Sequence, residues 1–356
     1  MFISRAQWRG DLERCGWQVC EGGPRSDERG SHAGRGVDVV VLAGGFGTRL
    51  KPWTESSPKP LLPILDRSMI EHVVDVLPDT LVDRVLIAAG YGIEKMREHF
   101  ESIDLPYEVL IVEETDPLGT GGAIANCREH LSGGAFCVIN GDLITSLRVE
   151  EMLDFHESNG GIATIALWEV EDPSRFGVAD YKQETGKIMR FQEKPSIEEA
   201  YSNLINAGTY ILEPEIFNLM PKGAHSIERD IYEDLAETGG LNGFPYEGWF
   251  VDAGTPSTFI EATQVCISES KFGSGSVDGD SWFGEDSENL GLVSGSSVGR
   301  SSVVGEGATV TNSVILDDAE VGAGSILDGC LIGRGAIISE GVGIKGKIVG
   351  HDSHVG

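Results

Sequence analysis

A run of β-branched residues that ends in a glycine-rich turn is the feature that most constrains the fold of this chain. The run spans residues 37–42, VDVVVL, and the turn that follows reads AGGFG at residues 43–47. An apolar run of this length predicts a buried strand of a parallel sheet, which carries the glycine turn at its carboxyl end. Open α/β sheets bind their ligands at this edge. The sequence therefore predicts a binding loop directly after its first strand.

The chemistry of this loop favours a polyphosphate ligand. Glycines let backbone N–H groups approach phosphate oxygens without interference from a Cβ atom, and Arg49 and Lys59 supply positive charge nearby. The loop does not match a dinucleotide-binding fingerprint, because Leu50 stands where the last glycine is required. No Gly-Lys-Ser/Thr motif of a Walker A loop follows either. A Rossmann dehydrogenase and a P-loop ATPase are both excluded.

The loop and the residues after it resemble the signature of the sugar-1-phosphate nucleotidyltransferases, or NDP-sugar pyrophosphorylases. The match reads LAGGFGTRLKPWT at residues 42–54 and PKP at residues 58–60, and the resemblance extends to about residue 266. A glycine turn between strand and helix would not explain the Thr-Arg-Leu and Pro-Lys-Pro at the family's spacing. The resemblance implies an α/β fold with a Rossmann-like, mostly parallel sheet. The nucleotide-binding residues that it implies in this loop are Leu42, Ala43, Gly44, Gly45, Gly47 and Thr48.

Two aspartates match the positions at which this family binds Mg²⁺. Asp142 follows an apolar run at residues 135–139, so we expect it at the same sheet edge as the glycine turn. Asp252 lies in the second matching segment, FVDAGTP at residues 250–256. A Gly-Asp pair alone is usually a turn, but two aspartates in the family's order support a magnesium site. The resemblance also places Gly141 at the nucleotide.

The sequence FQEKP at residues 191–195 resembles the family's Glu-Lys-Pro motif, whose glutamate contacts sugar hydroxyls and whose lysine contacts the sugar phosphate. A carboxylate accepts hydrogen bonds from vicinal hydroxyls, and an ammonium group suits a single phosphate. Alone, this motif could be a solvated turn, but FGV at residues 176–178 and NAG at 206–208 accompany it. The sugar-binding residues so implied are Gly177, Glu193, Asn206 and Gly208. Lys194 joins Arg49 and Lys59 as the implied catalytic cations.

The resemblance implies direct attack of a sugar-1-phosphate oxygen on the α-phosphorus of an NTP, with release of pyrophosphate. Catalysis would then rest on positioning and on charge neutralisation by Mg²⁺ and the three cations. A regulatory paralogue without turnover is one alternative, which the presence of these charged residues disfavours. Acyl transfer is another, for which His351 and His354 are the only candidate bases. Both lie in a polar run, so we expect them to be solvated.

Glu114 is the residue expected to contact the base. It lies upstream of PLGTGGA at residues 117–123, five positions before Gly119. This segment resembles the family's base-binding segment, which implies that Gly119 and Thr120 also bind the nucleotide. Uridine- and thymidine-using members typically carry glutamine here, whereas guanylyltransferases carry an acidic residue. A carboxylate pairs with the two adjacent N–H donors of guanine but opposes a carbonyl of uracil. We expect GTP with mannose 1-phosphate; glucose 1-phosphate with dTTP or UTP is the alternative, as is a solvated Glu114 that contacts no base.

Charge and cysteine content narrow the protein's partners and environment. The chain carries 27 Lys and Arg against 57 Asp and Glu, a net charge of −30 distributed along its length. Such a surface suggests solubility at high salt and excludes nucleic acid as a partner. Six cysteines without a Cys-x-x-Cys pair indicate neither a disulfide framework nor a zinc site. With no apolar run long enough to span a bilayer, the expected location is the cytoplasm.

Composition also divides the chain into segments. Residues 1–36 contain six arginines and five Asp or Glu, a net charge of +1. We expect them to be a disordered extension. A nucleotidyltransferase domain is expected to follow at residues 37–268. Residues 269–290 have the Gly-, Ser- and Asp-rich composition of a linker. Residues 291–356 resemble the hexapeptide repeat of a left-handed parallel β-helix, which we expect to form a homo-oligomer. The aliphatics expected to point inward are Leu292, Val298, Val304, Val310, Leu316, Val321, Leu327, Ile332, Ile338 and Ile344.

Overall fold

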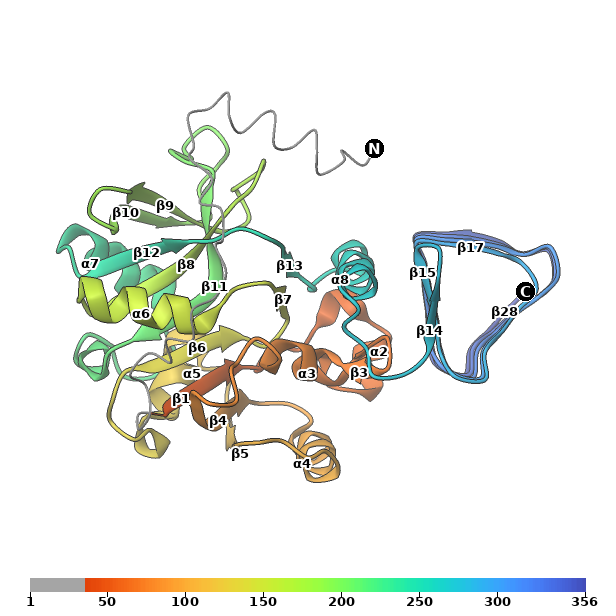
Figure 1. Ribbon diagram of the computed structural model, residues 1–356, viewed down its shortest axis with the longest axis horizontal. Helices are drawn as coiled ribbons and strands as arrows, with labels where there is room; N and C mark the ends of the chain where they lie inside the picture. Colours follow the sequence, from red (N-terminus) through yellow and green to blue (C-terminus); the bar gives the residue numbers. More distant parts are fainter. Residues whose placement is uncertain (1–35) are drawn as a thin grey trace, which may run out of the picture. The chain divides into compact units, whose positions relative to one another are not determined.

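The computed structural model describes residues 36–356, which form a helix-covered sheet followed by a coil of short strands (Figure 1). The expected extension at residues 1–36 lies outside the described residues, apart from Gly36. Within the described part, no helix has the length and apolar character that a bilayer crossing requires. The α/β class and the stacked parallel strands that the sequence predicts are both confirmed.

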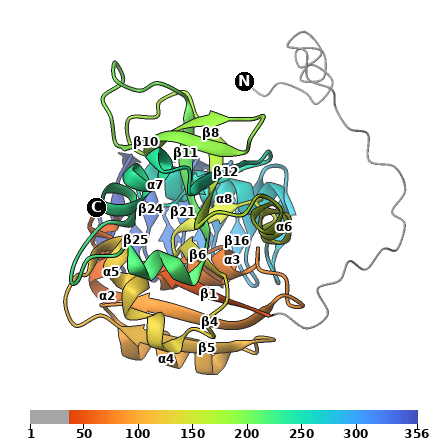
Figure 2. The same ribbon diagram turned by 90° about the vertical axis from the view of Figure 1, so that its left-hand side faces the viewer.

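The sheet has nine strands in the order β5-β4-β1-β6-β11-β8-β12-β10-β9, and Figure 2 shows β5 and β4 at one edge, next to β1. The first four strands in this order run parallel, whereas β11 runs antiparallel to both β6 and β8. The sheet is therefore mixed, with its parallel half at the glycine turn. The strands are β1 (Val37–Leu42), β4 (Val82–Ala89), β5 (Glu108–Glu113), β6 (Phe136–Asn140), β8 (Ala163–Glu169), β9 (Gly177–Lys182), β10 (Lys187–Glu193), β11 (Leu204–Leu212) and β12 (Leu241–Pro245).

Helices cover both faces of the sheet because the strand side chains alternate between two cores. Val39 and Val41 point into one core, shared with α3, α4 and α6, and Val40 points into the other, shared with α5 and α7. The helices are α2 (Trp53–Ser56), α3 (Met69–Val74), α4 (Ile93–Ser102), α5 (Gly119–Asn126), α6 (Val149–Asn159), α7 (Glu233–Glu237) and α8 (Pro256–Ser268). Helix α8 begins with a capping box at Thr255 and a proline in its first turn.

The remaining short elements connect these layers. The paired strands are β2 (Pro63–Ile64) with β3 (Arg67–Ser68), and β7 (Leu143–Thr145) with β13 (Phe250–Asp252). The 3-10 and π turns are η2 (Thr48–Leu50), η3 (Lys59–Leu61), η4 (Arg128–His130), η5 (Pro214–Asn218) and η6 (Glu228–Tyr232).

After α8 the chain winds into three sheets that enclose a triangular core (Figure 1). The first sheet contains β14 (Ser276–Asp278), β15 (Ser281–Phe283), β18 (Ser297–Val298), β21 (Val314–Ile315), β24 (Leu331–Ile332) and β27 (Ile348–Val349). The second contains β16 (Glu288–Asn289), β19 (Val303–Val304), β22 (Glu320–Val321), β25 (Ile337–Ile338) and β28 (His354–Val355). The third contains β17 (Leu292–Ser294), β20 (Thr309–Thr311), β23 (Ile326–Asp328) and β26 (Gly343–Lys345).

Strands of successive coils in the third sheet pair 17 residues apart, as Val310 does with Leu327. The inward column of this sheet is Val293, Val310, Leu327 and Ile344.

Three details of the predicted coil are wrong. Residues 269–290 are not a linker, because β14, β15 and β16 lie within them and Trp282 of β15 is buried in the cluster that includes α8. Leu292 does not point inward: it is 73% exposed, and its neighbour Val293 takes the inward position. Likewise Ile315 occupies the coil core, whereas Leu316 packs in a separate cluster with α8. A shift of one residue reverses the side of a strand on which a side chain lies.

A ladder of buried hydroxyls joins successive coils at one corner. Ser296 Oγ accepts a hydrogen bond from the Ser313 amide at 3.0 Å, and Ser313 Oγ accepts one from the Cys330 amide at 2.9 Å. Each bond spans 17 residues. The ladder satisfies amides that would otherwise be buried without a partner, so it fixes the register of one coil on the next.

Two adjacent residues of β23 test the inward register. Leu327 is fully buried in the coil core, and Ile326 is 59% exposed on the same strand. We expect Leu327→Ala to lower the free energy of unfolding by about 2 to 5 kcal/mol, because it leaves a cavity. Ile326→Ala should change that free energy by less than about 0.5 kcal/mol. Denaturant titration of both variants measures the difference, and equal losses would contradict the register.

Candidate active site

The carboxyl ends of β1 and β6 lie side by side and form the base of the site. Leu42 pairs with Asn140 in parallel register, and the Gly141 amide donates a hydrogen bond to the Leu42 carbonyl at 2.9 Å. A Cβ atom at Gly141 would lie only 2.8 Å from that carbonyl oxygen, so only glycine fits here. The residues after each strand, the glycine loop (residues 43–49) and Asp142, therefore share one edge of the sheet.

The glycine loop closes on the residues that follow it. Gly47 has a φ of 60°, a left-handed conformation that favours glycine, and it precedes the turn η2. Thr54 Oγ1 donates a hydrogen bond to the Gly47 carbonyl at 3.0 Å. A Cβ atom at Gly45, by contrast, would meet no atom within 4 Å. The loop thus presents an open backbone at Gly45 and a tightly packed one at Gly47.

Four charged side chains converge beside this loop. Lys59 Nζ forms an ion pair with Asp142 Oδ2 and is largely buried. A Cβ atom at Gly254 would lie 2.8 Å from Asp252 Oδ1, 3.1 Å from Arg49 Nη2 and 3.5 Å from Lys59 Nζ. The structure therefore brings together Arg49, Lys59, Asp142 and Asp252, which the sequence singled out from four separate segments.

Two pairings hold the aspartates next to each other. Leu143 of β7 pairs with Asp252 of β13, and the Ala253 amide donates a hydrogen bond to the Asp142 carbonyl at 2.9 Å. Burial raises the pKa of Asp252, and the charge of Asp142 raises it further, whereas Lys59 and Arg49 oppose the shift. Asp252 Oδ1 is buried and has no hydrogen-bond partner in the protein.

The aspartate pair fits a divalent cation. Two carboxylates with an unpartnered buried oxygen are suitable ligands for Mg²⁺, which keeps other positions for water and phosphate. Within residues 36–356, no cluster of three or more His, Cys, Asp or Glu side chains could hold a metal by itself. A cation here would therefore bind together with ligand oxygens.

Glu114 is buried against the glycine loop. It is 7% exposed, although Glu113 and Asp116 are exposed, so the alternative of a solvated glutamate is wrong. A Cβ atom at Gly44 would lie 3.0 Å and 3.4 Å from its two carboxylate oxygens. The Leu118 amide donates a weak hydrogen bond to Glu114 Oε2 at 3.4 Å, and burial raises the pKa of this carboxyl. The carboxylate is thus placed to interact with a ligand at Gly44.

Glu228, a residue that sequence reasoning missed, holds the segment around Gly119 in place by hydrogen bonds. Glu228 Oε2 accepts hydrogen bonds from Thr120 Oγ1 and Ser226 Oγ, each at 2.6 Å, and Tyr210 OH donates to Oε1 at 3.3 Å. Thr120 and Glu228 are 108 residues apart, and no local motif links them. Gly119 packs so closely on this segment that a Cβ atom would lie 2.6 Å from the His225 carbonyl oxygen.

The residues predicted to bind the sugar form a second group, separate from the four charged side chains. Glu193 and Lys194 pair with each other at 3.0 Å, and a Cβ atom at Gly177 would lie 2.9 Å from Glu193 Oε2. The Lys194 side chain is 55% exposed, and it pairs with Glu193 and with neither aspartate of the first group.

Asn206 and Gly208 connect this group to the strand end that carries Asp142. Asn206 Oδ1 accepts from the Gly208 amide at 2.9 Å, and its Nδ2 donates to Tyr210 OH at 2.9 Å. Gly208 has a φ of 67°, and a Cβ atom there would lie 2.5 Å from Asn140 Nδ2. Both predicted residues therefore lie beside the end of β6.

Arg175 is a further cation that sequence reasoning missed. It is exposed, lies in the loop before β9, and its charge lowers the pKa of Asp252. The next residue, Phe176, packs on Phe250 of β13 with ring centroids 6.0 Å apart, and its carbonyl accepts from the Lys194 amide. The loop therefore lies between Lys194 and the strand that carries Asp252.

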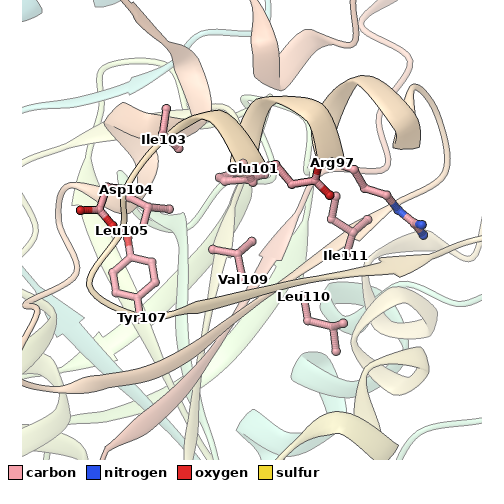
Figure 3. A pocket seen from close by; sticks show the side chains of 10 residues that line it. Arg97, Glu101, Ile103, Asp104, Leu105, Tyr107, Val109, Leu110 and Ile111 are labelled. Atoms are coloured by element: carbon pink, nitrogen blue, oxygen red, sulfur yellow. The ribbon is translucent and has the colours of Figure 1, made fainter.

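A separate hollow of about 480 Å³ lies between α4 and β5 (Figure 3). Val109 and Ile111 of β5 point toward the helix, whereas Leu110 points the other way. None of the predicted site residues lines this hollow. It is not part of the site.

The two histidines considered as acyl-transfer bases, His351 and His354, both contact other residues of the protein. His351 is half-buried, stacked on Trp53 with ring centroids 5.9 Å apart, so the expectation that it is solvated is wrong. Its Nδ1 accepts from the Arg334 amide at 3.0 Å. His354 is exposed, with Nε2 2.8 Å from Ser339 Oγ.

Comparisons with known proteins match both parts of the chain. Residues 38–269 match the nucleotidyl transferase family, and residues 285–354 match the GlmU-like C-terminal hexapeptide family. The chain is 36% identical to mannose-1-phosphate guanylyltransferase 1 of Arabidopsis thaliana over 65% of each chain, and 39% identical to mannose-1-phosphate guanyltransferase of Yarrowia lipolytica over 64% of each. The match thus spans less than two thirds of the length of each of these relatives.

A solved structure supports the fold of the first part. HddC from Yersinia pseudotuberculosis complexed with GMP-PN superposes with a TM-score of 0.55 and 30% identity, covering 64% of this chain and 99% of that one.

The coupling between the two aspartates can be measured. We expect Asp142→Asn to lower the pKa of Asp252, because it removes an adjacent negative charge and leaves Lys59 free to pair with Asp252. Carboxyl ¹³C NMR titration of aspartate-labelled protein, with the Asp252 signal assigned by its loss in Asp252→Asn, gives the value. Asp318→Asn, an exposed control in the coil, should leave it unchanged. An unaltered Asp252 pKa in Asp142→Asn would contradict this coupling.

Proposed function

The chain belongs to the nucleotidyl transferase family, and we propose that it joins an NTP to a sugar 1-phosphate, forming an NDP-sugar and pyrophosphate. The observation that carries this proposal is the convergence of Arg49, Lys59, Asp142 and Asp252 beside the glycine loop. A protein with a net charge of −30 needs such a local cluster to bind an anionic nucleotide. Of the residues expected to bind the sugar, Asn206 lies on β11, which pairs with β6, and Glu193 lies at the end of β10.

The reaction requires no covalent enzyme intermediate. An oxygen of the sugar phosphate attacks the α-phosphorus, and the bond to the bridging oxygen of the β-phosphate breaks as pyrophosphate leaves. The acceptor is already an anion, so the protein needs to align it and to neutralise charge. Arg49 of the glycine loop and Lys59 of η3 would face the triphosphate, and Lys194 would hold the sugar phosphate.

We infer that Mg²⁺ is the cofactor, held by Asp142 and Asp252. When bound, the ion supplies charge neutralisation at the phosphate oxygens. The ion pair between Lys59 and Asp142 keeps both groups oriented before the ligands arrive. Burial of Asp252 beside Asp142 makes cation binding more favourable, because a cation relieves the repulsion between the two carboxylates.

The buried carboxylate of Glu114 supports GTP as the nucleotide. Its position against Gly44 suits a charge-assisted pair with the N1–H and amino donors of guanine. The names of the Arabidopsis and Yarrowia relatives, both mannose-1-phosphate guanylyltransferases by description, support mannose 1-phosphate as the acceptor. The GMP-PN complex of the Yersinia protein supports a guanine nucleotide.

Arg49 should contribute to transition-state stabilisation at the triphosphate. We expect Arg49→Ala to lower kcat/KM by an amount equivalent to about 2 to 4 kcal/mol, while the thermal melting temperature stays the same because the side chain is exposed. Arg97→Ala, which removes an exposed arginine of α4 at the separate hollow, is the matched control. Pyrophosphate release measures both, and a normal kcat/KM in Arg49→Ala would refute this role.

Glu114 should set the base preference. We expect kcat/KM for GTP to exceed that for UTP and dTTP in the wild type, and Glu114→Gln to reduce that ratio at least roughly tenfold, since it removes one charge-assisted pair. The assay uses each NTP with mannose 1-phosphate and with glucose 1-phosphate. A wild type that prefers UTP or dTTP, or a variant with the GTP preference intact, would show that Glu114 does not select guanine.

A further inference from the structure

One tryptophan of the signature segment joins the nucleotidyl transferase part to the last coil. Trp53 is fully buried, and its Nε1 donates a hydrogen bond of 2.9 Å to the carbonyl of Val349 in β27. Its ring stacks on His351 with an interplanar angle of 21° and meets Phe259 of α8 edge-on at 5.8 Å. The indole therefore has a directed bond to the coil as well as apolar packing.

The neighbours of Trp53 contact the coil on one side and the glycine loop on the other. A Cβ atom at Gly350 would lie 3.2 Å from Pro52 Cγ, so the coil packs directly on the residue before Trp53. Thr54, the residue after it, is buried and donates to the Gly47 carbonyl. A Cβ atom at Gly47 would lie 2.8 Å from Thr54 Cγ2. The path from β27 to Gly47 thus runs through two consecutive residues.

The coil side of this contact is itself held in place. The Arg334 amide of the preceding coil donates to His351 Nδ1, which orients the imidazole ring against Trp53. A contact that only excluded water would need no more than an apolar side chain at position 53. The Val349 carbonyl also accepts from the Gly333 amide at 3.0 Å, so the indole N–H is a second donor that fixes the orientation of Trp53 on the coil.

We propose that the last coil of the β-helix holds the glycine loop in its ligand-binding shape, with Trp53 as the positioning residue. Thr54 transmits this support to Gly47, at the point where the loop turns back to Arg49. The coil would thereby set the activity of a site to which it contributes no ligand contact. This inference rests on the proposed function only in its kinetic part, because the order of the loop can be measured without turnover.

The test replaces Trp53 by Phe in the full chain, which keeps an aromatic ring and removes the N–H donor. We expect backbone hydrogen exchange in peptides covering residues 43–50 to become roughly three- to tenfold faster, the change expected from loss of one buried hydrogen bond. We expect kcat to fall by a similar factor and KM for the sugar 1-phosphate to stay unchanged, since the loop faces the nucleotide.

Trp282→Phe is the matched control, because Trp282 is buried in the same cluster as Trp53 but its Nε1 donates to the Ser274 carbonyl at 3.1 Å and not to β27. It should leave exchange at residues 43–50 and kcat unchanged. His351→Ala weakens the stack from the coil side alone and should accelerate exchange at the same residues even if Trp53→Phe folds poorly. Loop exchange unaltered in both Trp53→Phe and His351→Ala, or altered equally in Trp282→Phe, would overturn the proposal. A wild type without turnover would reject the proposed function and leave the exchange result to be judged separately.

Discussion

The hydrogen bond from the Gly141 amide to the Leu42 carbonyl is the interaction on which the arrangement of the site depends. It continues the parallel pairing of β1 and β6 for one residue beyond the strands, where two loops separated by about a hundred residues begin. One loop carries the open backbone at Gly45, and the other carries the carboxylate of Asp142. Parallel pairing is what brings two such loop starts to the same edge.

Most of the fold could be predicted because its periodicities are strong. Strands and helices alternate through the parallel half of the sheet, and apolar runs such as residues 37–42 have no competing interpretation. The coil was harder, since aliphatic residues stand next to each other at Leu292 and Val293 and either could point inward. The supposed linker at 269–290 failed for a related reason: glycine and serine also form the corners of a β-helix.

The site was predictable where residues lie in dense motifs and unpredictable where a single residue acts across the fold. Arg49 and Asp252 belong to recognisable segments, and the structure places both beside Gly254. No sequence motif identifies Glu228, because its partner Thr120 is distant in sequence and glutamate is common in this acidic chain. The same holds for His351, whose polar neighbours suggested exposure although its ring faces Trp53.

The hydroxyl ladder of the coil has an evolutionary consequence. Because Ser296, Ser313 and Cys330 succeed one another at intervals of 17 residues, an insertion or deletion of that length preserves every amide partner and every inward side chain. A coil can also be shorter, since the Ser296 amide donates to Ser281 Oγ at 3.2 Å across 15 residues and β15 pairs with β18 at the same interval. The C-terminal part can therefore gain or lose length in whole coils, as repeat proteins do, while its contact with the first part depends on which coil occupies the position of Val349.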